Sequence, residues 1–220
     1  MSTGELRRAM GAGIAFVVLF VFGTFASLGP EIKDHDTSSA AATKYLDYVA
    51  KHSNRVGLIL GAYALILAAI AFIWFTQGIR RWGGETIVGG FVGALGVLAG
   101  AAMIAAGMTA AVVAGAVSLG NTPGPGTNGG EAVRWVMSMS YPFLFVCVGL
   151  VSAAIIGAIS IGGLRAGVVP KWLAYAGILG VLGGVFGVIF LPMALVVLWY
   201  LALAIVGLRS NAGTAPPAAA

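Results

Sequence analysis

The sequence predicts an all-α, polytopic membrane helix bundle with six transmembrane helices. Of its 220 residues, 60% are hydrophobic and 9% are charged, and the mean hydropathy is +1.00. A soluble domain of this size needs more charge to cover its surface. Lipid admits only helices or closed barrels as spanning structures. The apolar runs are continuous and do not alternate with polar residues as barrel strands do, so they indicate helices.

The first apolar run covers residues 10–28 and follows Arg7 and Arg8. A secretory signal peptide has a similar pattern, but its apolar core usually has about 7–15 residues. The longer run favours a retained first spanning helix, and cleavage of residues 1–26 is the alternative. Three further runs cover residues 56–79, 86–119 and 131–164, and Pro142 interrupts the last of them.

The last apolar run covers residues 172–208 and would extend roughly 55 Å as one helix. Because the hydrocarbon core is about 30 Å thick, we expect two helices that turn near Leu191 and Pro192. One kinked helix, which gives five spans, is the alternative. We expect residues 1–208 to form a single transmembrane bundle domain. The remaining residues 209–220, rich in Ala and Pro, are typical of a disordered cytoplasmic tail.

The charges predict which side of the membrane each loop occupies. With six spans and both termini inside, the inner side holds Arg7, Arg8, Arg80, Arg81, Arg165, Lys171 and Arg209 against Glu5 and Glu85. The outer side holds Lys33, Lys44, Lys51, Arg55 and Arg134 against Glu31, Asp34, Asp36, Asp47 and Glu131. This asymmetry follows the positive-inside rule. We therefore expect a multi-pass protein of the plasma membrane with both termini cytoplasmic.

A polar segment precedes the second run. On a helix at residues 40–54, Tyr45, Leu46 and Val49 share one face, whereas Asp47 and Lys51 share the other. This pattern predicts a short amphipathic helix on the outer surface, packed on the outer ends of the third and fourth runs.

Five polar residues near this segment are candidates for an outer-face site: Asp47, His52, Arg55, Glu131 and Arg134. We expect His52 and Arg55 to face Glu131 or the loop at 121–130. The residue types support no more specific prediction of chemistry.

Glycines at four-residue spacing allow two helix backbones to approach closely in lipid. The relevant residues are Gly89, Gly93, Gly96, Gly100, Gly180 and Gly184. They predict tight packing within one chain or, alternatively, a homo-oligomer or larger membrane complex.

Between their flanking charges, the spanning runs contain no Asp, Glu, Lys, Arg or His. Ion-coupled transporters usually keep such a group at membrane depth, and metal or haem sites need grouped ligands. We therefore expect no catalytic residues, no metal site and no bound cofactor. The basic residues lie at the ends of apolar runs, where they meet lipid headgroups, so we expect no nucleic-acid partner.

Two segments of the sequence resemble a group of known proteins. They are SSAAATKYLDYVAKHSNRVGLILGAYALILAAIAFIWFTQGIRR, at 38–81, and VVPKWLAYAGILGVLGGV, at 168–185. They resemble uncharacterised bacterial multi-pass integral membrane proteins. The resemblance implies a six-helix bundle and no established activity.

The sequence thus favours a non-enzymatic integral membrane protein, either an accessory or structural component or a binder of lipid or a small apolar ligand. An uncoupled small-molecule transporter or facilitator is the alternative. A membrane enzyme with a site on the outer face is a weaker one.

Overall fold

The computed structural model describes residues 2–30, 38–82, 87–118, 129–189 and 191–210, and every regular element in these ranges is a helix. Four helical stretches are long and apolar enough to cross a membrane. They are α1 (Thr3–Ala26), α3 (His52–Trp82), α4 (Ile87–Ser118) and the helix at 129–165 that contains α5 (Gly129–Ser138), η1 (Pro142–Cys147) and α6 (Val148–Arg165). The protein is therefore an all-helical, membrane-embedded bundle, as its composition predicts.

The last apolar run forms two helices, as predicted, and not one kinked helix. They are α7 (Lys171–Val185) and α8 (Met193–Arg209), with the short 3-10 helix η2 (Gly187–Ile189) between them. An added Cβ at Gly183 would lie 2.9 Å from the Leu195 Cβ atom, so the two helices pack closely next to the turn. They contain 15 and 17 residues, fewer than any of the four long helical stretches.

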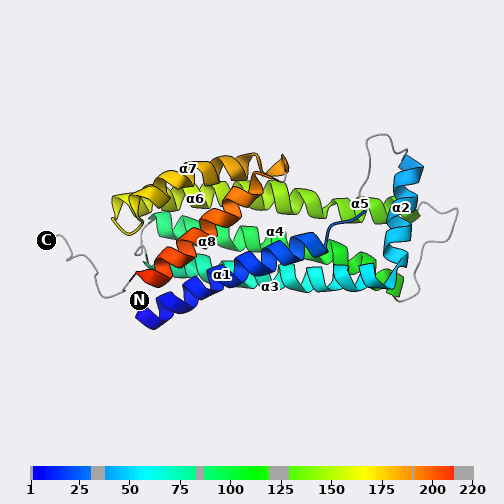
Figure 1. Cartoon of the computed structure of the whole chain (residues 1–220), viewed down its shortest axis with the longest axis horizontal. Helices are drawn as coiled ribbons and strands as arrows, with labels where there is room; N and C mark the ends of the chain where they lie inside the picture. The colour runs from blue at the N-terminus through cyan, green and yellow to red at the C-terminus, as the bar shows by residue number, and fades with distance from the viewer. Residues whose placement is uncertain (1, 31–37, 83–86, 119–128, 190, 211–220) are drawn as a thin grey trace.

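The helices lie side by side, with α3 between α1 and α4, and α6 between α4 and α7 (Figure 1). The described ends of the chain, at the start of α1 and the end of α8, lie at the same end of the bundle. This basic end carries the seven residues that the sequence assigns to one side: Arg7, Arg8, Arg80, Arg81, Arg165, Lys171 and Arg209. The opposite, distal end is crossed by α2 (Ser38–Ala50) (Figure 1).

An aromatic cluster joins α1, α3 and α8 in the core. The Tyr200 ring is fully buried and meets Phe16, Phe72 and Phe75 edge to face, at centroid distances of 5.8, 5.2 and 6.1 Å. Such pairs contribute about 0.5–1.5 kcal/mol each beyond the area that they bury. The cluster holds α8 against the first two long helices.

The helix at 129–165 continues through Pro142, where the sequence indicated an interruption. Pro142 begins the π-helical segment Pro142–Cys147, whose wider turns accommodate a residue that has no N–H to donate. Just before this segment, the Ser140 hydroxyl bonds to the Thr109 hydroxyl and to the Ala106 carbonyl oxygen of α4. The helix is therefore anchored to α4 where its geometry changes.

The spaced glycines pack helices of this chain against each other. An added Cβ at Gly100 would lie 2.7 Å from Ile73 on α3, and at Gly96 it would overlap Thr76. At Gly180 it would lie 3.1 Å from Ile156 on α6. These glycines thus serve close packing within the chain, one of the two uses that their spacing predicts.

The amphipathic helix is present but shorter than the predicted 40–54. It ends at Ala50, and His52 already begins α3. Its apolar face packs on the distal ends of α4 and α5: Val49, 1% exposed, lies in one cluster with Val113 and Val133. The predicted packing on the ends of the third and fourth runs is therefore present.

Candidate functional site

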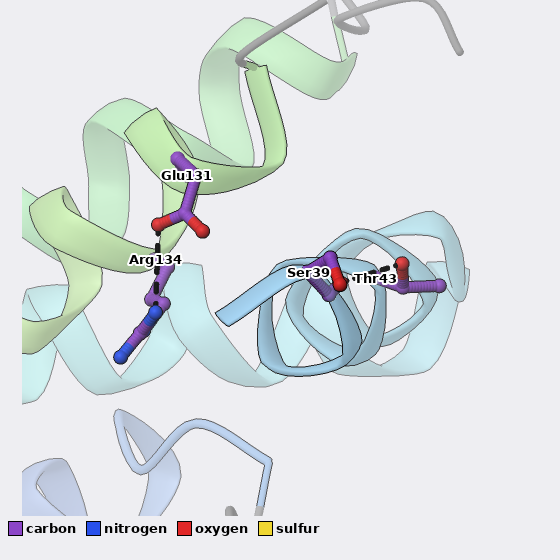
Figure 2. A network of polar contacts seen from close by, with 4 residues as sticks. All are labelled: Ser39, Thr43, Glu131 and Arg134. Carbon is purple, nitrogen blue, oxygen red and sulfur yellow. Dashed lines mark hydrogen bonds and ion pairs between the residues drawn. The ribbon is translucent and has the colours of Figure 1, made fainter. Parts of the chain in front are cut away.

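The candidate residues at the distal end do not all converge. Glu131 and Arg134 form an ion pair within α5, with 3.4 Å between the carboxylate and guanidinium atoms (Figure 2). Arg55 points to α2 and donates to the Val49 and Ala50 carbonyl oxygens at 3.0 and 2.8 Å. The remaining two candidates, Asp47 and His52, are exposed. A shared ligand site of these residues stays a prediction.

The bonds of Arg55 have a structural role. The last carbonyl groups of a helix have no partner within it. Arg55 and Asn54, whose side-chain amide donates to the Tyr48 carbonyl oxygen at 2.9 Å, supply partners for the end of α2. The Tyr48 hydroxyl donates to the Leu28 carbonyl oxygen at 3.0 Å. Burial raises the pKa of Tyr48, which keeps the donating proton in place. These contacts hold α2 over the distal end.

Ser39 and Thr43 lie on the part of α2 that Figure 2 shows beside Glu131 and Arg134 of α5. The Thr43 hydroxyl donates to the Ser39 carbonyl oxygen at 2.9 Å, a local bond within α2. An added Cβ at Gly130 would lie 3.0 Å from Leu46 and 3.1 Å from Ala42, so the two helices are in direct contact. The distal end is thus a packed cap.

A groove of about 710 Å³ opens at the basic end. It lies between the end of α3, the start of α4, the end of α6 and the turn that follows α6. Its lining is Ile79, Arg80, Trp82, Val88, Gly89, Phe91, Val92, Ala158, Ile159, Ile161, Gly162, Gly163, Arg165, Ala166, Val168 and Val169. We call it the basic-end groove. Its volume falls in the range of about 300–1,000 Å³ that is typical of small-molecule sites.

Glycines at the end of α6 shape this groove. Gly162 brings the backbone of α6 close to α4, since an added Cβ would lie 3.2 Å from Val88. Gly167 has a positive φ of 67°. Its N–H bonds to the Leu164 carbonyl and that of Val168 to the Gly163 carbonyl, so the two bonds form a Schellman motif. This tight turn folds Val168 back, and Val168 becomes part of the groove wall.

The groove is open toward the side of the bundle. Three of its apolar side chains are exposed: Val88 at 41%, Phe91 at 51% and Ile161 at 59%. In a membrane-embedded bundle such side chains face lipid. A ligand with a hydrocarbon chain can therefore reach the groove laterally, from within the bilayer.

Two arginines belong to the groove lining. Arg80 lies in the last turn of α3, Arg165 is the last residue of α6, and both are exposed. Within the described ranges neither of them forms an ion pair. Among the described residues, the lining includes no acidic side chain. The groove therefore combines apolar walls with two arginines that have no acidic partner among the residues that the structure describes.

A second hollow, of about 530 Å³, lies at the same end between α1 and α3. Its lining includes Glu5, Arg8, Gln77 and Arg81. The Ser2 backbone N–H donates to the Glu5 carboxylate at 2.8 Å, and a glutamate carboxylate is charged at neutral pH. Its charge offsets part of the positive charge of the neighbouring arginines, Arg8 and Arg81.

Five buried hydroxyl oxygens have no hydrogen-bond partner within the part of the chain that the structure describes. They belong to Thr24, Ser27, Ser152, Ser160 and Tyr200. An unsatisfied buried hydroxyl costs about 1–3 kcal/mol. Among the described residues, no group of three or more His, Cys, Asp or Glu side chains is placed to hold a metal ion.

Comparisons with protein-family models, curated proteins and solved structures give no match for this chain. The basic-end groove was not predicted from the sequence. Its components are visible there as the pair Gly162–Gly163, next to Arg165, and as Arg80 at the end of the second run. The sequence does not show that these segments meet.

Proposed function

We propose that this protein is a non-enzymatic, lipid-binding integral membrane protein. The observation that carries the proposal is the laterally open groove, with apolar walls and two arginines at the membrane border. An acyl chain can pack against these apolar walls as it packs in the bilayer. A membrane lipid reaches the groove without leaving the bilayer. Binding in this groove requires no reactive side chain.

The proposed placement puts the basic end in the cytoplasm, with both termini at the inner face of the plasma membrane. On α3, the exposed Tyr63 and the Arg80–Arg81 pair are roughly 26 Å apart along the helix. This distance is close to the hydrocarbon thickness of about 30 Å. Tyrosine is common at membrane interfaces, and arginine at the cytoplasmic one.

In this placement, the start of α7 and the end of α8 both lie on the cytoplasmic side of the membrane. The two helices are only roughly 22 and 25 Å long, and the tip between them exposes the apolar residues Phe186, Ile189 and Leu191. We therefore favour a hairpin whose tip stays in the membrane, beside four complete crossings. The six-crossing topology predicted from the sequence requires this tip to reach water. In both arrangements the two termini lie on the same side of the membrane.

The lipid proposal can be tested by filling the groove. Ala158 lines it, whereas Ala154, one turn earlier on α6, is exposed outside it. Ala158→Trp should reduce the phospholipid that the purified protein retains in native mass spectrometry, and Ala154→Trp should leave it unchanged. The exposed lining residue Ala166 offers a second filling variant, Ala166→Trp. Equal retention in all variants would contradict lipid binding in the groove.

An uncoupled facilitator is the second candidate, and the buried hydroxyls favour it. Hydroxyls without protein partners are often bonded to buried water, and Ser152 and Tyr200 lie in the centre of the bundle. A facilitator would speed the equilibration of a small polar solute across proteoliposomes. Replacement of Ser152 by Ala should slow this flux; an unchanged flux, or no flux above that of empty liposomes, would eliminate this candidate.

A further inference from the structure

We infer that the basic-end groove selects an anionic phospholipid, whose headgroup phosphate is bound by Arg80 and Arg165 while an acyl chain lies along the apolar walls. This inference rests on the proposed lipid binding and adds the class of lipid. The preference for an anionic lipid depends on the charges at the groove, whereas lipid binding itself depends on the apolar walls.

The two arginines come from different helices and line the same groove. A guanidinium group can donate two parallel hydrogen bonds to phosphate oxygens. Neither arginine is engaged in an ion pair within the described residues. Both are therefore available to a headgroup whose chain occupies the groove between them.

Two of the helix ends at the groove would repel a phosphate group if they carried no basic side chain. Arg80 and Arg165 lie at the C-terminal ends of α3 and α6. The C-terminal end of a helix carries partial negative charge, which repels an anion. The start of α4, whose N-terminal end carries partial positive charge, also borders the groove. The two guanidinium groups carry the full charges at the groove, so their neutralisation should reduce the preference for an anionic lipid.

The lining also discriminates between headgroups. A zwitterionic headgroup carries an ammonium group besides its phosphate, and the lining within the described ranges includes no carboxylate that could pair with it. Basic pockets between membrane helices on the cytoplasmic side are known to suit anionic headgroups. Free inorganic phosphate offers the same charge but gains nothing from Val88, Phe91 and Ile161.

The test compares phosphatidylglycerol with phosphatidylcholine of the same acyl chains. The full chain is placed in mixed nanodiscs, and the lipids that stay bound after release are counted by native mass spectrometry. The variants are Arg80→Gln, Arg165→Gln and both together. Arg209→Gln is the matched control, because this exposed arginine lies at the same end but outside the groove lining.

We expect the wild-type protein to retain phosphatidylglycerol preferentially, and each groove substitution to reduce this preference by about fivefold. The control should keep the wild-type preference, and added inorganic phosphate should displace no lipid. An unchanged preference in the double variant, an equal loss in Arg209→Gln, or displacement by phosphate would overturn the inference.

The two proposals fail in different ways. If the wild-type protein retains both lipids equally and Ala158→Trp abolishes this retention, lipid binding stands and the headgroup assignment is wrong. If the wild-type protein retains neither lipid, the proposed function is wrong and the headgroup assignment falls with it.

Discussion

Gly149 of α6 and Gly184 of α7 lie backbone to backbone. A Cβ atom added to Gly184 would lie 2.5 Å from the Gly149 carbonyl oxygen, and one added to Gly149 would lie 2.7 Å from the Gly184 carbonyl oxygen. Neither position tolerates a side chain without a shift of the backbone. In lipid, helices associate through such close packing and not through exclusion of water. This contact holds the α7–α8 hairpin against α6.

Replacement of Gly184 by Ala should destabilise the protein by about 1–3 kcal/mol, the usual cost of overpacking a tight contact. The added methyl group would also lie 2.9 Å from the Ala153 Cβ atom. Thermal unfolding in mild detergent measures the change.

The matched control is Gly90→Ala, because an added Cβ at Gly90 meets no atom within 4 Å. We expect this control to be neutral or slightly stabilising, since Ala favours helix more than Gly does. If both variants unfold at the same temperature as the wild type, the contact between α6 and α7 is not as close as described.

The distal cap should hold α2 against α5. Val49 and Val133 are buried in one cluster, 1% and 8% exposed. With Cys147 replaced by Ser, the pair Val49→Cys and Val133→Cys should crosslink efficiently. Adding Arg55→Ala should reduce crosslinking severalfold, because the end of α2 loses the bonds to the Val49 and Ala50 carbonyls.

The control for the cap is Lys51→Ala, which removes an exposed positive charge next to Arg55. It should leave the crosslinking yield unchanged. If Val49 and Val133 never crosslink, or if a spin label at Val49 reports contact with lipid, α2 lies flat on the membrane and the cap does not exist.

The tip of the α7–α8 hairpin should be inaccessible from the outer side. We expect Leu191→Cys, in a background with Cys147→Ser, to resist a membrane-impermeant thiol reagent in intact cells. Its side chain is apolar and 77% exposed on the hairpin, which suits lipid and not water. Ser53→Cys, next to the distal cap, is the positive control and should be labelled. Labelling of Leu191→Cys from outside would establish the six-crossing topology instead.

Hydropathy predicted where the helices lie because the backbone N–H and C=O groups of a membrane-spanning apolar run must form their hydrogen bonds within that segment, as a helix does. The run at 56–79 lies inside α3 (His52–Trp82), and the run at 86–119 nearly coincides with α4 (Ile87–Ser118). The structured helices extend beyond the run at 56–79 because polar residues can continue a helix outside the hydrocarbon. The split of residues 172–208 followed from length alone.

The local geometry at Pro142 and Arg55 could not be predicted in the same way. Proline usually breaks a helix, but a π-helical segment accommodates Pro142. The expected partners of Arg55 were Glu131 or the loop at 121–130, most of which lies outside the described residues. The structure shows that α2 ends at Ala50, within reach of the Arg55 guanidinium group.

The groove was missed because it depends on contacts between distant segments. Val88 of α4 meets the backbone of Gly162 of α6, and nothing in the spacing of either helix indicates this pairing. The sequence directed attention to the distal end, where charge is densest. The basic end contains charges that the positive-inside rule explains, so the sequence did not point to a groove there.

The location of a bound lipid tests the central claim most directly. A phospholipid with a photoactivatable acyl chain is incorporated into membranes with the full chain, and its crosslinks are mapped by peptide mass spectrometry. We predict that crosslinks concentrate on Val88, Phe91 and Ile161 and decrease severalfold in Ala158→Trp but not in Ala154→Trp. Crosslinks spread evenly over other exposed apolar residues, such as Val18 and Ile178, and insensitive to Ala158→Trp would contradict a lipid site in the basic-end groove.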